Sequence, residues 1–118
     1  MSEVLIVDDN KDICWLISYF LKEEGYEIDI ACDGSTALEK IRDKRYDIII
    51  LDYKLYEING LTVLEKIRDI RPSSKVIMIS AYGDKSTRKR AEELEVLDFL
   101  EKPLDMKKLV KVIKKGMK

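Results

Sequence analysis

The stretch DIIILD, residues 47–52, places four consecutive large apolar residues between two aspartates. An apolar run without alternation is typical of a strand buried on both faces, as in a parallel sheet covered by helices. Similar runs occur in VLIVDDN (residues 4–10), KVIMIS (75–80) and VLDFLE (96–101). YEIDIAC (26–32) instead alternates, with Ile28, Ile30 and Cys32 on one side, which favours an edge strand. The pattern predicts five strands, with residues 47–52 in the centre.

Amphipathic segments separate these strands. Residues 11–24, 33–45, 61–68 and 84–94, and the segment after Asp105, are expected to be helices because their apolar residues recur every three or four positions. Gly25 is predicted to end the first helix in a left-handed conformation, and Asp105 to cap the last. Five strands alternating with five helices predict an α/β, doubly wound (βα)5 sandwich with a parallel sheet, forming one domain over residues 1–118.

Composition restricts the chemistry. The net charge of −1 gives no general attraction to nucleic acid or membrane, so neither is expected as a direct partner. A membrane span and a signal peptide are also not expected, which favours a cytoplasmic protein. The absence of histidine removes the commonest general base and zinc ligand. The two cysteines, Cys14 and Cys32, are predicted to be small core residues, with a disulfide between them as the alternative.

Polar residues follow the predicted strands where each strand ends. They are Asp8 and Asp9, Asp52, Ser80 and Lys102. One aspartate after a strand is usually a turn residue, but parallel strands bring this whole set to one edge of the sheet. Clustered carboxylates repel each other unless a cation intervenes, and Mg2+ prefers such oxygen ligands. Carboxylates, Mg2+, a lysine and a hydroxyl together suit phosphoryl transfer, with one carboxylate as the nucleophile.

These motifs resemble those of response-regulator receiver domains. The resemblance rests on LIVDDN (5–10), DIIILDYKL (47–55), NG (59–60), VIMISAYGD (76–84) and DFLEKPLD (98–105), and it covers essentially the whole chain. It implies a flavodoxin-like sheet with strand order 2-1-3-4-5. SAYGD and KPLD are also similar to the single-domain sporulation phosphorelay intermediate and to nitrogen-regulator-like activators. The absence of an output domain leaves a stand-alone regulator or an excised receiver, and KKGMK at the end mildly favours the former.

The resemblance also implies roles for individual residues. Asp52 would be the phosphoacceptor, and Asp9, Asp52 and the backbone carbonyl of Lys54 would bind Mg2+ directly, with Asp8 acting largely through water. Lys102 would pair with the phosphoryl group and precede a cis peptide bond to Pro103. Ser80 and Phe99 would be the switch hydroxyl and the switch aromatic residue. The chain would be a switch rather than an enzyme, although it would assist its own phosphorylation and dephosphorylation.

Some positions depart from the family pattern. Tyr56 replaces a common proline and Glu57 a frequent glycine, although Gly60 is retained. Glu95 stands where a glycine often ends the fourth helix, so either it adopts a positive φ or the turn is built differently. Lys54 and Tyr82 flank the expected path of water to the phosphoryl group, and we expect their size to prolong the phosphorylated state.

The resemblance implies a sensor histidine kinase or histidine phosphotransferase as donor, and a downstream protein target that the sequence does not name. The donor is expected near the first helix, with Ile13, Cys14 and Ile17 as candidate contacts and, as the alternative, some of these three as plain core residues. The fourth helix, fifth strand and fifth helix are the expected output surface. The fourth helix has a thin apolar stripe of Thr87, Ala91 and Leu94 and is expected to be the least stable.

Two other functions are weighed against this one. A magnesium-dependent phosphohydrolase with an aspartate nucleophile would typically carry a second aspartate two positions later, where this chain has Lys54. A binding module that has lost phosphorylation would normally lack one of the five polar residues described above. Turnover of a phosphate ester would support the phosphohydrolase, and failure to bind Mg2+ would support the inert module.

Overall fold

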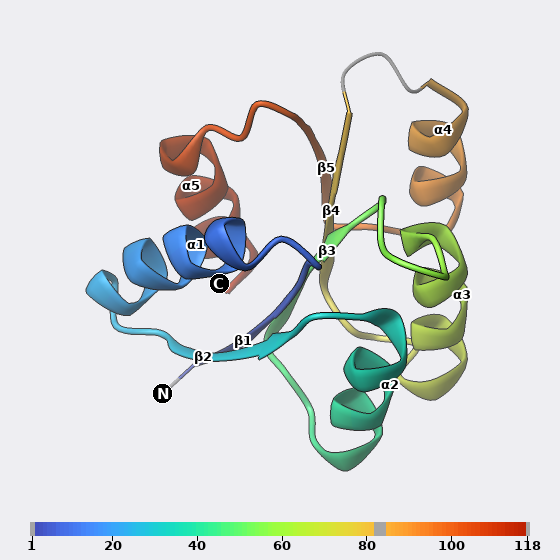
Figure 1. Ribbon diagram of the computed structural model, residues 1–118, viewed down its shortest axis with the longest axis horizontal. Helices are drawn as coiled ribbons and strands as arrows, with labels where there is room; N and C mark the ends of the chain where they lie inside the picture. Colours follow the sequence, from blue (N-terminus) through green and yellow to red (C-terminus); the bar gives the residue numbers. More distant parts are fainter. Residues whose placement is uncertain (1, 82–84, 118) are drawn as a thin grey trace.

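The computed structural model describes residues 2–81 and 85–117 and consists of a five-stranded sheet between two layers of helices (Figure 1). The strands are β1 (Glu3–Val7), β2 (Glu27–Ala31), β3 (Ile48–Asp52), β4 (Val76–Ser80) and β5 (Asp98–Glu101). The helices are α1 (Lys11–Glu23), α2 (Gly34–Asp43), α3 (Gly60–Ile70), α4 (Lys85–Glu93) and α5 (Met106–Gly116). The predicted alternation of strands and helices is confirmed.

All neighbouring strands are parallel, in the order β2-β1-β3-β4-β5. Helices α1 and α5 cover one face of the sheet, and α2, α3 and α4 cover the other (Figure 1). Every residue of β3 and β4 is buried, because helices pack on both of their faces. The doubly wound fold and strand order expected from the sequence are therefore confirmed.

The sheet edge at β2 only partly matches the expected alternation. β2 is an edge strand, as predicted, but Ile30 is 37% exposed and the strand ends at Ala31. Cys32 therefore lies outside the strand and is exposed, so its assignment to the core was wrong. Cys14 is buried as predicted, and both cysteines are free thiols rather than disulfide partners.

Four helices begin at a side chain that accepts hydrogen bonds from their first backbone N–H groups. These N-cap residues are Asn10, Asp33, Asn59 and Asp105. Such caps satisfy donors that have no partner within the helix. The predicted cap at Asp105 is confirmed, and so is the left-handed Gly25 after α1, with φ of 91°.

Helix α4 buries few apolar side chains, as its thin apolar stripe predicted. Thr87 and Ala91 are its buried residues, and Leu94 is half-buried just beyond its end. Glu95 then adopts φ of 60°, which confirms the positive-φ alternative. Arg68 of α3 donates to the carbonyls of Leu94 and Glu95 and so holds this turn against α3. Low stability of α4 remains a prediction.

Within the described residues, no helix combines the length and the apolar character needed to cross a membrane.

Candidate functional site

Three carboxylates meet where β1 and β3 end. Val7 pairs with Leu51 across the ladder, so the residues that follow, Asp8 and Asp52, emerge side by side. One oxygen from each of Asp8, Asp9 and Asp52 lies within 4.8 Å of the other two. Asp8 and Asp52 are only 2% and 3% exposed, whereas Asp9 is exposed. Sequence and topology together thus place three acidic groups at one point.

Burial makes this cluster electrostatically costly. It raises the pKa of Asp8 from 3.8 to about 6, and the neighbouring Asp52 carboxylate adds to the rise. The backbone N–H of Asn10 opposes the rise by donating to Asp8 Oδ1 at 2.9 Å. A divalent cation would neutralise the remaining repulsion, and carboxylate oxygens are the ligands that Mg2+ prefers.

Lys102 supplies a positive charge on the other side of Asp52. Its Nζ lies 3.1 Å from Asp52 Oδ2, and the Lys102–Pro103 peptide bond is cis as predicted. The strand order explains this contact, because β4 alone separates β3 from β5 and Lys102 directly follows β5. Lys102 is thus placed to stabilise added negative charge on Asp52.

Two buried polar atoms at the site have no hydrogen-bond partner among the described residues. They are Asp52 Oδ1 and Ser80 Oγ. Leaving such atoms unpaired costs free energy, so native structures rarely contain them without a functional reason. A metal ion at Asp52 and a phosphoryl oxygen at Ser80 would satisfy both atoms. The donor set therefore fits a hard cation together with an oxyanion.

The connection between β3 and α3 is packed closely against the site. A Cβ on Gly60 would lie 2.5 Å from the backbone oxygen of Asp52 and 2.7 Å from Tyr53 Cα. Only glycine therefore fits at this position without displacing backbone, which accounts for the retained NG pair. Glu57 in the same loop has φ of 69°, and Tyr56 is 72% exposed.

Other predicted residues vary in how they relate to this cluster. Phe99 is 6% exposed and packs in the core on the side of α3 and α4. The side chain of Lys54 is exposed, and Tyr82 lies outside the described residues. The effect of both residues on the lifetime of the phosphorylated state remains a prediction. Sequence reasoning missed Asn10 as a partner of Asp8, although an asparagine directly before a helix is a recognisable N-cap signal.

Two of the three candidate kinase contacts on α1, Cys14 and Ile17, were wrong. Cys14 and Ile17 are 2% and 1% exposed and belong to the core, and Ile13 packs against the same cluster. The apolar stripe of an amphipathic helix faces its own protein, so Cys14 and Ile17 are unavailable to a partner, whereas half-buried Ile13 remains a candidate contact. The exposed apolar residues of α1 are instead Trp15, Leu16, Tyr19 and Phe20.

Comparison with known proteins agrees with this geometry. Residues 4–114 match the model of the response regulator receiver domain. The chain belongs to this family. Phosphoryl acceptance in two-component signalling is the function of response regulator receiver domains, and Mg2+ is their cofactor.

Individual relatives of this receiver domain are similar over nearly its whole length. Transcriptional regulatory protein ZraR from Klebsiella oxytoca is 34% identical over 107 residues, which is 91% of this chain and 24% of ZraR. The solved receiver domain of NtrX from Brucella abortus is 34% identical, with a TM-score of 0.90 and 97% of each chain covered. Response regulator TrrA from Thermotoga maritima, solved with Mg2+ and BeF, is also 34% identical, with a TM-score of 0.88 and 98% and 99% coverage. The receiver domain described here spans about a quarter of the length of ZraR and about half of the length of response regulator ArlR from Staphylococcus saprophyticus.

Proposed function

We propose that this receiver domain accepts a phosphoryl group on Asp52. The observation that carries the proposal is the setting of that carboxylate, which is buried, 3.1 Å from Lys102 Nζ and close to two further carboxylates. Its Oδ1 is unpaired within the described residues, and unpaired Ser80 Oγ shares its buried surroundings at this edge of the sheet. A buried acceptor between Lys102 and a metal ion held by the neighbouring carboxylates would suit the transfer of a negatively charged group.

Mg2+ would be held by Asp9 and Asp52 together with the backbone carbonyl of Lys54, while Asp8 would act largely through water. The close approach of the three carboxylates supports this assignment, and so does the solved complex of TrrA with Mg2+ and BeF, a mimic of a phosphoryl group. When bound, the ion neutralises negative charge on the carboxylates and on the transferred group.

The donor would be a phosphohistidine on a cytoplasmic histidine kinase or phosphotransferase. An oxygen of Asp52 forms a bond to phosphorus as the N–P bond of the donor breaks, and the imidazole leaves with the electron pair. Lys102 then pairs with the new phosphoryl oxygens and the hydroxyl of Ser80 donates to one of them. Inward movement of Ser80 makes room for Phe99 to turn, which changes the α4, β5 and α5 surface seen by a downstream partner.

Hydrolysis of the aspartyl phosphate would return the switch to its resting state, with the domain assisting both transfer and hydrolysis. Lys54 and Tyr82 would lengthen the lifetime by restricting the approach of water. Their size and their positions two residues after Asp52 and Ser80 support this role. The lifetime proposal fails if Lys54→Ala and Tyr82→Ala both leave the dephosphorylation rate unchanged.

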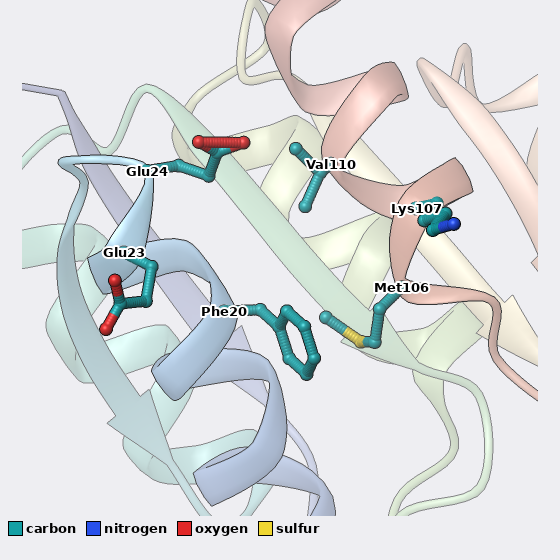
Figure 2. Close-up of a pocket in the computed structure, with 6 residues that line it drawn as sticks. All are labelled: Phe20, Glu23, Glu24, Met106, Lys107 and Val110. Atoms are coloured by element: carbon teal, nitrogen blue, oxygen red, sulfur yellow. The ribbon is translucent and has the colours of Figure 1, made fainter.

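The donor would dock on the exposed face of α1 and the adjoining start of α5. Trp15 and Tyr19 are 68% and 52% exposed, and their rings stack with centroids 5.9 Å apart. Beside them is a groove of about 300 Å3 between α1 and α5, where Phe20 and Met106 lie close together (Figure 2). Both helices start at the edge of the sheet that carries the acceptor, so a helical donor lying along α1 toward its start would bring its phosphohistidine near Asp52.

Direct phosphorylation tests the acceptor. The parent chain and an Asp52→Asn variant would be incubated with Mg2+ and acetyl phosphate and compared by intact mass. One added phosphoryl group on the parent and none on the variant is the expected result. Equal modification of both would place the acceptor elsewhere, and failure to modify either chain, with no Mg2+ binding, would favour an inert interaction module.

A further inference from the structure

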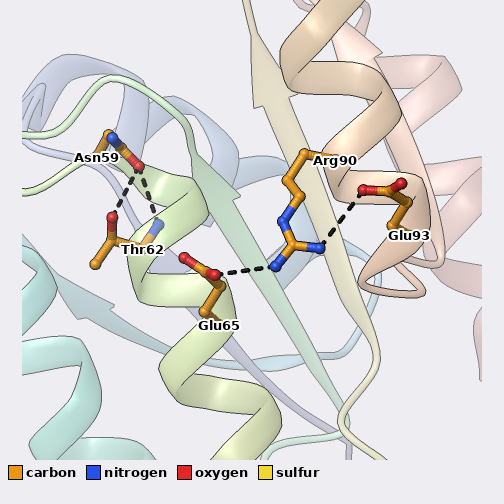
Figure 3. Close-up of polar contacts among 5 residues, drawn as sticks. All are labelled: Asn59, Thr62, Glu65, Arg90 and Glu93. Atoms are coloured by element: carbon orange, nitrogen blue, oxygen red, sulfur yellow. Dashed lines mark hydrogen bonds and ion pairs between the residues drawn. The ribbon is translucent and has the colours of Figure 1, made fainter.

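Two arginines attach the surface of helix α4 to its neighbours. Arg90 connects the helix to α3, with Nη2 3.0 Å from Glu65 Oε2, and it also approaches Glu93 within its own helix (Figure 3). Since Thr87 and Ala91 are the buried residues of α4, its other contacts with neighbouring elements are made at its exposed surface.

Arg88 connects the same helix to β5 on the other side. Its guanidinium carbon lies 5.7 Å from the centre of the Phe99 ring, within the range of a cation–π interaction. Its Nη1 is 3.7 Å from Glu101 Oε1, and its Nε donates to Glu92 at 3.1 Å. One side chain thus contacts two alternate residues of β5, which point to the same face of the strand.

Those two residues connect directly to the acceptor site. Glu101 pairs with Ser80 across the β4–β5 ladder and precedes Lys102, whose Nζ contacts Asp52. Phe99 lies two residues earlier, buried in the core cluster that also contains Met78 and Ala91. Any shift of Ser80 or Lys102 toward a phosphoryl group therefore acts on the strand that Arg88 contacts.

We propose that Arg88 couples β5 to helix α4 and stabilises the resting arrangement of the switch through its contacts with Phe99 and Glu101. This inference rests on the proposed role of Asp52 as acceptor. When Phe99 turns, the ring leaves the guanidinium, so the cation–π contact opposes activation. Arg90 has no part in this coupling because its partners lie on α3 and on α4 itself.

The two arginines form a matched pair for a test. Their side chains are 49% and 45% exposed, and Arg88→Gln and Arg90→Gln each remove one positive charge from the same helix. The chain contains two phenylalanines, Phe99 and Phe20, so uniform 4-fluorophenylalanine labelling gives one 19F signal from the switch and one reference from α1. Titration with beryllofluoride in the presence of Mg2+ would follow both signals.

The coupling predicts that Arg88→Gln shifts the Phe99 signal of the resting protein and leaves the Phe20 signal unchanged. The beryllofluoride concentration at the midpoint of the titration should fall about three- to five-fold. A change of this size corresponds to the free energy of one exposed cation–π contact together with one surface ion pair. Arg90→Gln should move neither the signals nor the midpoint appreciably. In a Phe99→Leu background, with α4 followed by hydrogen exchange, Arg88→Gln should lower the midpoint less than it does in the parent, because only the ion pair with Glu101 remains to be lost.

Equal midpoints for the Arg88→Gln and Arg90→Gln proteins would overturn the coupling, as would a midpoint that rises in the Arg88→Gln protein. Failure of the proposed function has a different signature. In that case no variant responds to beryllofluoride, and the role of Arg88 in switching falls as well, even if its substitution still shifts the Phe99 signal of the resting protein.

Discussion

Asp8 is a residue whose position in the fold opposes its own ionisation. It follows a strand with no exposed apolar residue, and it is almost completely buried beside Asp52. Its pKa is raised to about 6, chiefly by burial, so the folded protein retains a proton that the unfolded chain releases near pH 3.8. The charge on Asp8 consequently costs stability at neutral pH unless a cation neutralises it.

We therefore predict that Asp8→Asn stabilises the metal-free protein at pH 7.5. The folded-state pKa is above the unfolded value, so this contribution to stability is greatest below pH 3.8 and is lost as the pH rises through about 6. At about 1.4 kcal/mol per pKa unit, the gain from substitution is up to about 3 kcal/mol. Urea unfolding in a chelator between pH 4 and 8 measures it.

The difference between Asp8→Asn and the parent should shrink steeply toward pH 4, where Asp8 is protonated in the folded state and about half protonated in the unfolded chain. At pH 7.5, saturating Mg2+ should reduce this difference in the free energy of unfolding, because Mg2+ binding stabilises the parent more than the variant. A variant that is less stable than the parent at every pH would contradict the assignment of a destabilising charge to Asp8.

At the level of elements, the end of α4 stores backbone strain. Glu95 occupies the left-handed region, and the N–H groups of Glu95 and Val96 donate to the carbonyls of Glu92 and Ala91. This is the hydrogen-bond pattern in which glycine is the usual left-handed residue. Hydrogen bonds from Arg68 to this turn hold the strained residue in place.

Replacing Glu95 with glycine should stabilise the protein by about 1 kcal/mol, because the left-handed conformation carries no Cβ penalty in glycine. Lys89→Gly, at an exposed position inside α4, should instead destabilise it by about 1 kcal/mol. Chemical denaturation of the two variants measures both effects. Destabilisation by both substitutions would show that Glu95 adopts its left-handed conformation in the parent without a cost in free energy.

For the whole molecule, the proposed donor surface on α1 and helix α4 lie on opposite faces of the sheet (Figure 1). The layer of α1 and α5 carries the exposed residues Trp15 and Tyr19, whereas α4 in the opposite layer contacts β5 through Arg88. The acceptor lies at the edge of the sheet between the layers. A donor on one layer and a responding helix on the other can therefore be occupied at the same time.

Accordingly, Trp15→Ala combined with Tyr19→Ala should slow phosphotransfer from a purified histidine kinase that labels the parent chain. We expect at least a ten-fold loss, since a central exposed tryptophan commonly contributes more than 1 kcal/mol to an interface. Phosphorylation by acetyl phosphate should be unchanged. Leu97→Ala, at an apolar position 40% exposed and located before β5, is the control and should leave both reactions unchanged.

Equal losses with kinase and acetyl phosphate would mean that the aromatic substitutions disturb the acceptor site itself. An unchanged rate with the kinase would place the donor on another surface.

The sequence was sufficient to predict the parallel sheet and the set of polar residues that gather at its edge. Uninterrupted apolar runs such as residues 47–52 specify buried parallel strands, and such strands bring Asp8, Asp52 and Lys102 together. Periodicity did not identify the docking face, because it finds the side of α1 that packs inward. Periodicity also could not predict the contacts of Arg88. A long exposed side chain has many rotamers, and its tertiary neighbours decide which one it adopts.

The contrast between the two cysteines gives this domain one reactive position for a thiol-directed label. Burial raises the pKa of Cys14 to about 12 and removes its thiol from reagents, while Cys32 is exposed just after β2. A maleimide dye would therefore attach at one position without any mutation. That position adjoins Ala31, whose carbonyl accepts a hydrogen bond from the backbone of Asp8. Fluorescence from the dye would follow ion binding at the neighbouring carboxylates in real time.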